Sequence, residues 1–379
     1  MSLFTRAVNP LERRSTPSPW MVPPPSDGVS QDPRTADAAL RHSTVWGCIS
    51  LIAETLGSMP IDVYRKGPDG VNYEVDAPMI VTDPSPTIDP ISWRTQFVSS
   101  LLAHGNSYGL ISHMGANGWP DEIEWLDPST VRPQWGKNNR LEFITPFGVF
   151  TKSEIVHTPG LVVPGNPIGM SPIRHFAQTI GVGLSAQAFG AKWFADGAHP
   201  SAIIYSEHEQ DEVSAKQIKA SFMRAVTGRE PAVMGAGLKY EQVSVPANES
   251  QFLEAIGANA AIIAGQIFRV PPEMLGISSQ GKSITYANRE QHAVDFLTFT
   301  LLPWITRFER MMSAQLPNKQ FVKLNVGALL RSDTKTASEV AAIDLTNRIR
   351  TQNEVRLKFD LPPVPGGNEF SPIGGNNNA

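Results

Sequence analysis

The pattern of apolar and polar residues divides the first 160 residues into helical and strand-like runs. An apolar-rich run predicts a helix at 44–57, and apolar residues at helical spacing predict another at 90–104. Alternation of apolar and polar residues predicts a strand at 107–114, which a glycine-containing turn joins to the next strand as a hairpin. Further short strands are predicted at 59–65, 122–126, 141–144 and 148–150. This part of the chain is therefore α+β, with a β-rich half.

A different pattern begins at Pro172, since proline can open a helix at its first turn. An apolar stripe at helical spacing predicts a helix over 172–196. Gly181, Gly183 and Gly190 lie inside this helix, and each costs about 1 kcal/mol relative to alanine. Two interpretations remain open: a weak helix that tolerates its glycines, or a helix packed closely against neighbouring helices, including those of other copies of the chain.

The rest of the chain alternates in type. We predict a strand at 201–205, a helix at 214–226, a hairpin within 232–244, a helix at 249–268, a long helix at 289–315, a strand at 320–326 and a helix at 333–357. Pro303 should kink the long helix, because proline cannot donate a helical hydrogen bond. Prolines and few aliphatic residues in 1–36 predict a disordered N-terminal arm, and the composition of 361–379 predicts a disordered tail.

Composition and charge narrow the classes of function. Of the 379 residues, 41% are hydrophobic, which is enough for a substantial core in two or three units. The formal net charge of −4 argues against tight binding of duplex DNA, whose affinity comes mainly from phosphate neutralisation. The single cysteine, Cys48, excludes a disulfide framework within the chain and any multi-cysteine metal site. With no apolar run of membrane-spanning length and no signal segment, we expect a soluble protein, made in a cytoplasm, without a membrane partner.

Gly276–Ser283 matches the phosphate-loop pattern, which would make the chain a nucleoside triphosphatase. In such a loop a buried strand delivers the chain and a helix begins directly after it. Here Pro271 and Pro272 precede the pattern, and a central strand does not tolerate two consecutive prolines. The nearest candidate for a metal-binding acidic strand, 341–344, lies in a polar helical stretch. We therefore interpret the pattern as a polar loop between two helices.

No constellation of residues argues for catalysis. The eight histidines are scattered, and none forms an H-x-x-x-H or H-E-x-x-H pair that would indicate a metal site. Acidic residues surround His208, and a solvated turn explains them. A nucleophile elbow and a dinucleotide-binding glycine pattern are both absent from the sequence. We predict a protein that is not an enzyme, with no cofactor and no metal.

Several blocks resemble the portal proteins of tailed bacteriophages with long non-contractile tails. The blocks are 43–54, 59–65, 101–108, 169–173, 198–201, 251–254, 267–272 and 301–303. Each block is loose by itself, but all of them occur in the order of that family. This common order makes the resemblance fairly specific across residues 43–316.

The resemblance implies a structural DNA conduit. In that family a ring, usually of twelve copies, occupies one capsid vertex of the virion and is assembled in the host cytoplasm. The implied partners are double-stranded DNA, the terminase large subunit, the head–tail connector or adaptor protein, and the major capsid protein. Two alternatives stay open: the nucleoside triphosphatase with Gly276–Ser283, and another head–tail connector or capsid-associated structural protein.

The implied fold is an α+β portal architecture with a β-rich wing, two long stem helices, a small α/β clip, a tunnel loop and a reduced helical crown. The segments are the arm (1–36), the wing (37–171), stem helix 1 (172–199), the clip (200–247), stem helix 2 (248–269), the tunnel loop (270–288), a wing segment with a long kinked helix and a strand (289–330), a short crown helix (331–360) and the tail (361–379). In the tunnel loop, Gln280, Lys282 and Ser283 would line the DNA channel. In stem helix 1, Gly181, Gly183 and Gly190 would allow close packing around the ring.

Overall fold

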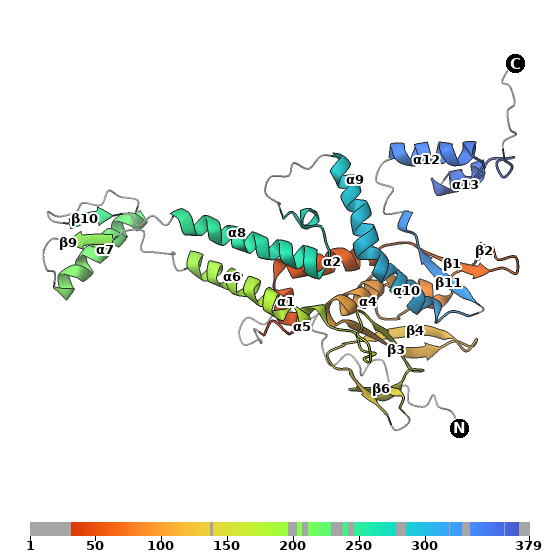
Figure 1. Cartoon of the computed structure of the whole chain (residues 1–379), viewed down its shortest axis with the longest axis horizontal. Coiled ribbons are helices and arrows are strands. Elements are labelled where there is room, and N and C mark those ends of the chain that lie inside the picture. The colour runs from red at the N-terminus through yellow and green to blue at the C-terminus, as the bar shows by residue number, and fades with distance from the viewer. Residues whose placement is uncertain are drawn as a thin grey trace, which may run out of the picture. The chain divides into compact units, whose positions relative to one another are not determined.

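A computed structural model of the chain is shown in Figure 1. It describes residues 32–136, 139–195, 203–206, 211–228, 238–241, 246–277, 286–317, 319–327, 334–359 and 361–370. The chain divides into two compact units. Unit 1 comprises Met1–Ile52, Phe97–Gly109 and Trp125–Ser283, and unit 2 comprises Ala53–Gln96, Leu110–Glu124 and Ile284–Ala379.

Within the described residues, helices lie on both sides of the β-rich half in the sequence. The α-helices are α1 (Ala36–Leu40), α2 (Ser43–Gly57), α3 (Met79–Thr82), α4 (Pro90–His104), α5 (Pro172–His175), α6 (Ala177–Ala195), α7 (Glu212–Gly228), α8 (Pro246–Ile262), α9 (Tyr286–Asp295), α10 (Leu302–Ser313), α12 (Thr334–Thr346) and α13 (Gln352–Lys358). Two segments are π-helical, η2 (Ile263–Ile267) and η4 (Phe296–Leu301), and η3 (Pro272–Leu275) is a 3₁₀-helix.

The strands form small sheets of two or three members. One sheet has the order β11-β1-β2, from β1 (Ile61–Lys66), β2 (Asn72–Glu74) and β11 (Gln320–Leu324). A second has the order β4-β3-β8, from β3 (Asn106–Met114), β4 (Pro120–Leu126) and β8 (Ile155–Pro159). A third has the order β5-β6-β7, from β5 (Arg132–Trp135), β6 (Leu141–Thr145) and β7 (Gly148–Thr151). The fourth pairs β9 (Ile203–Ser206) with β10 (Leu238–Glu241).

The α+β prediction is confirmed, and most predicted elements are present within a few residues of their expected ends. The helices α2 and α4 and the strands β1, β3, β4, β6, β7, β9 and β11 all occur where the apolar pattern placed them. The elements α1, α3, β2, β5 and β8 were not predicted, because each has five residues or fewer and too short a run to show a period. β2, for example, is entirely exposed.

Two predicted single helices are divided in the structure. The helix expected at 172–196 breaks at Phe176, whose φ of −102° and ψ of 23° leave the helical range, so that α5 and α6 are separate. The helix expected at 333–357 ends at Thr346 and a new one begins at Gln352. Arg348 lies between them with a φ of +57°, which no helix residue adopts. The hairpin expected within 232–244 lies outside the described residues except for β10, which pairs with β9.

Each of the two long helices predicted at 289–315 and 249–268 contains a π-helical segment. The helix expected at 289–315 consists of α9, the π-helical η4 and α10. Pro303 lies in the first turn of α10, where its missing N–H breaks the regular ladder after a π-helical segment. The helix expected at 249–268 is α8 followed by the π-helical η2.

Local order extends into both segments that were expected to be disordered. Thr35 accepts a hydrogen bond from Ala38 N and caps α1, so defined structure begins before residue 37. At the other end, Asn353 of α13 bonds to Val364 and Gly367. Residues 1–31 and 371–379 lie outside the described residues.

Each unit has its own aromatic core. In unit 1 the ring of Tyr108 stacks on His157, with 4.8 Å between ring centroids, and both contact Phe143. In unit 2 Trp93 meets Phe308 edge to face at 6.5 Å, and its indole N–H donates to Ile123 O at 2.7 Å. Trp93, Phe143 and Phe308 are large, fully buried side chains that fix the elements around them.

Candidate functional site

The two long helices of unit 1, α6 and α8, lie side by side in Figure 1. Asn259 of α8 ties them together, because its side-chain N–H donates to Thr179 O of α6 at 3.1 Å. Between the two helices, the sequence inserts α7 and the β9–β10 pair. The helices α6 and α8 therefore pack against each other and are connected in the sequence through a small module of α7, β9 and β10.

Gly183 lies where α6 approaches α8 and the chain before α2. It is buried, and a Cβ atom at this position would collide with His42 Nε2 and Asn259 Oδ1. A Cβ at Gly181 would lie 3.1 Å from Pro33 Cγ, which is a tight contact. Gly190 is also buried. The glycines at 181 and 183 therefore permit close packing within one copy of the chain, and packing between copies stays a prediction.

His42 is the polar centre of this helix contact. It is 3% exposed, and its Nδ1 accepts a hydrogen bond from Thr44 N at 3.2 Å. Burial lowers the pKa of His42 below its ordinary value, while Asn259 partly opposes this shift. The imidazole is therefore neutral near pH 7, and no ion is buried between α6 and α8 at this point.

The segment expected to be a tunnel loop (270–288) begins with residues that are held in place by contacts within unit 1. Val270 is fully buried and its N–H donates to Ala264 O at 2.8 Å. Leu275 packs on α2, where a Cβ at Gly47 would lie 3.2 Å from its Cδ2 atom. Gly276 then adopts a φ of +72°, the left-handed conformation that ends η3. Gln280, Lys282 and Ser283 lie outside the described residues.

The approach to Gly276 also tests the phosphate-loop hypothesis. In the described residues before it, the chain runs through π-helical η2 and 3₁₀-helical η3, and not through a strand. The next described helix, α9, begins at Tyr286, after the end of the pattern. A phosphate loop needs a strand on one side and a helix directly on the other. This context does not support nucleotide binding.

A junction in unit 1 was missed by sequence reasoning, although it joins two of the family-like blocks. Asn106 is 6% exposed, and its side chain forms a pair of bonds with the backbone of Gly169: Oδ1 accepts from N and Nδ2 donates to O, both at 2.8 Å. His157 Nε2 lies 3.0 Å from the same Oδ1. A Cβ at Gly105, whose φ is +73°, would collide with Met170 O. We call the set Gly105, Asn106, His157 and Gly169 the asparagine junction.

The electrostatics of the asparagine junction keep it uncharged. Burial lowers the pKa of His157 to about 4, with a smaller contribution from Lys152. The neutral ring can donate its Nε2 hydrogen to Asn106 Oδ1, which completes the side chain's hydrogen bonding. Tyr108 stacks on the face of the same ring. The junction therefore holds β3, β8 and the segment before α5 in one fixed arrangement.

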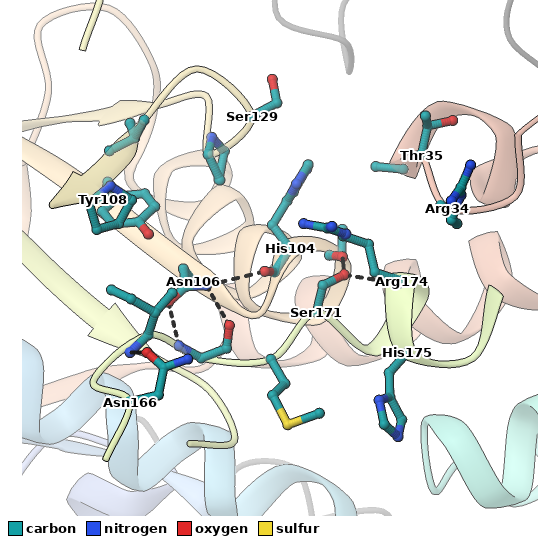
Figure 2. A pocket seen from close by; sticks show the side chains of 18 of the residues that line it. Arg34, Thr35, His104, Asn106, Tyr108, Ser129, Asn166, Ser171, Arg174 and His175 are labelled. Atoms are coloured by element: carbon teal, nitrogen blue, oxygen red, sulfur yellow. Dashed lines mark hydrogen bonds between the residues drawn. The ribbon is translucent and has the colours of Figure 1, made fainter. Parts of the chain in front are cut away.

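A cavity of about 810 Å³ opens beside the asparagine junction (Figure 2). Its walls come from residues 34–37, 103–108, 128–133 and 166–175. Figure 2 labels Arg34, Arg174, His104 and His175 among its polar lining. Arg34 forms an ion pair with Asp32, with 2.8 Å between Nη2 and Oδ2. Burial lowers the pKa of His104 below its ordinary value. These groups add polar side chains to a lining that is mostly apolar, without a concentrated charge.

Among the described residues, no group of three or more His, Cys, Asp or Glu residues is placed to hold a metal ion. Of the described helices, none has both the length and the apolar character needed to cross a membrane.

The chain is similar to one protein family over most of its length. Residues 43–360 match the family model described as phage portal protein. The chain is 28% identical to the probable portal protein of Streptomyces phage phiC31, over 88% of its own length and 77% of that protein. It is 26% identical to the portal protein of Enterobacteria phage HK97, over 86% and 80% of the two chains. Its fold resembles a chain in the neck of the native gene transfer agent particle computed with C12 symmetry, with a TM-score of 0.63 and 18% identity over 90% of this chain and 95% of that one.

Proposed function

The chain belongs to the phage portal protein family, and we propose that twelve copies of it form a ring at one vertex of a phage capsid. The observation that carries this proposal is the family match, which extends from α2 to the residues just after α13. Portal proteins are components of the virion. The C12 symmetry of the neck particle that contains a similar fold supports the number of copies.

The ring would conduct double-stranded DNA during packaging and ejection. Its other partners would be the terminase large subunit, then the head–tail connector or adaptor, and the major capsid protein around it. Assembly would take place in the host cytoplasm. A slightly acidic chain suits such a conduit, because weak attraction to phosphates lets DNA slide.

The predicted segments supply the parts of the ring. The wing would comprise 37–171 with 289–330, and the crown 331–360, where the structure has α12 and α13 in place of one helix. The stem would consist of 172–199 and 248–269, which include α6 and α8, and the clip of 200–247, which lies between them in the chain. The side-by-side packing of α6 and α8 around Gly183 supports this assignment. The arm (1–36) and the tail (361–379) receive no role in the conduit.

Lys282, with Gln280 and Ser283, would face DNA in the tunnel loop (270–288). One lysine per copy gives a weak contact that salt screens easily. Lys282→Glu should impair packaging or retention of DNA and leave ring assembly intact, while Lys282→Arg should behave like the wild type. Normal DNA packaging and retention by the Glu variant would contradict the role of Lys282.

We also propose that the chain is not an enzyme. The absence of a strand before Gly276 among the described residues supports this over the nucleoside triphosphatase. The family match favours a portal protein over another head–tail connector or capsid-associated protein.

Light scattering combined with negative-stain imaging of the purified chain tests the proposal. We expect rings with a central hole and a mass of about twelve times the 41.3 kDa of one chain. A monodisperse monomer at every concentration would count against the ring. A monomer that binds ATP, and loses binding on Lys282→Ala, would replace the conduit by a nucleotidase.

A further inference from the structure

The α12–α13 hairpin of unit 2 has almost no hydrophobic core. Among its described side chains between 338 and 359, the only buried hydrophobic ones are Ala341 and Val355. Large apolar side chains are exposed instead: Val340 at 45%, Ile343 at 56%, Ile349 at 63% and Leu357 at 74%. In the described part of the chain, each of the two helices packs mainly against the other. The hairpin therefore leaves most of its apolar surface uncovered within one copy.

The conformation of this hairpin is nevertheless closely specified. Thr351 and Glu354 form a capping box that starts α13, with reciprocal hydrogen bonds between side chain and backbone. Asn353 binds the backbone of Val364 through both ends of its amide. Ile349 N donates to Asp344 O across the turn between the helices. A surface that is both apolar and fixed in shape is typical of an interaction site.

The exposed apolar residues lie on the outer sides of the hairpin. In a helix each residue advances by about 100°, so two positions separate opposite sides. Ile343 is two positions after the buried Ala341, and Leu357 is two positions after the buried Val355. Each helix therefore has one side in the small core and an apolar residue on the opposite side. Repeat proteins use this arrangement, because stacked neighbours complete a core that one unit cannot form alone.

The charges of the two helices indicate which sides meet. α12 carries Lys335 against Glu339 and Asp344, so its formal net charge is negative, and Asp344 is paired with Arg350 of the turn between the helices at 3.7 Å. α13 carries Glu354 against Arg356 and Lys358, so its net charge is positive. Contact between α12 of one copy and α13 of the next joins opposite charges, whereas α12 against α12 joins like charges. Such a head-to-tail contact is the kind that closes a ring.

We propose that the hairpin is completed by copies of itself, with the Ile343 side of α12 in one copy packed against the Leu357 side of α13 in the next. This inference rests on the proposed ring and assigns a specific contact to it. The hairpin would then form a continuous band of helices in which each copy both offers and receives an apolar side.

Cross-linking between two introduced cysteines tests this contact directly. The variant Ile343→Cys with Leu357→Cys is purified as rings and treated with a short bis-maleimide reagent, and products are separated on a denaturing gel. We expect a ladder of covalent multimers up to the full ring, because every copy offers one thiol in each direction. Either single variant should stay monomeric. Cys48 adds little background, since burial raises the pKa of its thiol to about 12.

The matched control moves one cysteine to Ala342, which is exposed and lies about 100° around the helix from Ile343. Ala342→Cys with Leu357→Cys should give no ladder. Dimers from Ile343→Cys alone would show a two-fold contact and overturn the proposal. Intact rings without any ladder, and with rapid hydrogen exchange in 352–358, would overturn it while the ring itself stands. A chain that forms no rings would contradict the proposed function as well.

Discussion

Two asparagines make the same pair of hydrogen bonds in very different surroundings. In unit 1 the amide of Asn106 accepts from Gly169 N and donates to Gly169 O. In unit 2 the amide of Asn353 accepts from Val364 N and donates to Val364 O. Each side chain thus imitates a strand partner for a single residue of a distant segment. The first is buried in the asparagine junction, while the second lies in a hairpin with little core.

The difference between them shows that the surroundings, more than the bonds, decide how much a hydrogen bond contributes. At Asn106 a lost bond leaves a buried carbonyl, that of Gly169, without its donor. At Asn353 water and Asn368, which lies 2.8 Å from Nδ2, can take over part of the interaction. We infer that the asparagine junction fixes unit 1 within one copy, and that the hairpin depends on what covers it.

The largest effect expected is from Asn106→Asp. The carboxylate cannot donate to Gly169 O and places a charge in a buried site. The free energy of unfolding should therefore fall by about 3 to 4 kcal/mol. Asn353→Asp should cost about 1 kcal/mol or less, because its site is wetter and Asn368 can turn its amide to donate. Thermal unfolding of both variants, with hydrogen exchange at 161–170 and 361–370, checks the pair. Equal losses at the two positions would refute the role of burial.

The next largest effect concerns pH and separates the same two regions. The pKa of His157 is about 4 in the folded chain and about 6.5 when unfolded, so the unfolded state takes up the proton first as pH falls. The contribution of His157 to the free energy of unfolding should therefore fall by about 3 kcal/mol as pH falls from about 6.5 to 4. His157→Phe keeps the stacking on Tyr108 and should reduce this slope. Hydrogen exchange at β8 should show the loss, and α13, whose hairpin contains no histidine, should not.

Two glycines of the α6–α8 pair differ in the same way: Gly183 is closely packed, and Gly257 has free space around it. Gly183→Ala should cost about 2 kcal/mol, because the new methyl group collides with His42 and Asn259. Gly257→Ala in α8 meets no atom within 4 Å and should stabilise the helix by about 1 kcal/mol. Unfolding of dissociated chains measures both effects. If Gly257→Ala instead prevents ring formation, its surface contacts another copy.

Much of the fold could be predicted from the apolar pattern, because helices such as α2 and α4 and strands such as β3 follow their local period. The breaks could not be read from that pattern. The helix predicted over 333–357 runs on through the turn at Arg348, although the Thr351–Glu354 spacing is the signature of a capping box and marks the start of α13. Here the cap signal gave the correct start of a new helix, and the prediction of one continuous helix was wrong.

The candidate site was predictable only in part, because its contacts join distant residues. Gly183 stood out as a small residue within a helix, but nothing in the sequence pairs it with His42 and Asn259. Gly105, Asn106 and Gly169 lie in two of the family-like blocks, yet their hydrogen bonds appear only when the chain folds. Lys282 lies outside the described residues, so its contact with DNA stays a prediction.

The smallest effects expected come from the two helix caps that border these regions. Ser171 Oγ accepts from Arg174 N and donates to Ala103 O, so it joins α5 to the end of α4. Thr351 Oγ accepts from Glu354 N and, among the described residues, makes no such second bond to a distant segment. Ser171→Ala should therefore cost about 1.5 kcal/mol and Thr351→Ala about 1 kcal/mol, with Ser171→Thr and Thr351→Ser as near-neutral controls. In assembled rings the Thr351→Ala loss should shrink, because neighbouring hairpins would hold α13 in place, while the Ser171→Ala loss should not change. Identical losses for Thr351→Ala in rings and in dissociated chains would show that the hairpin gains nothing from its neighbours.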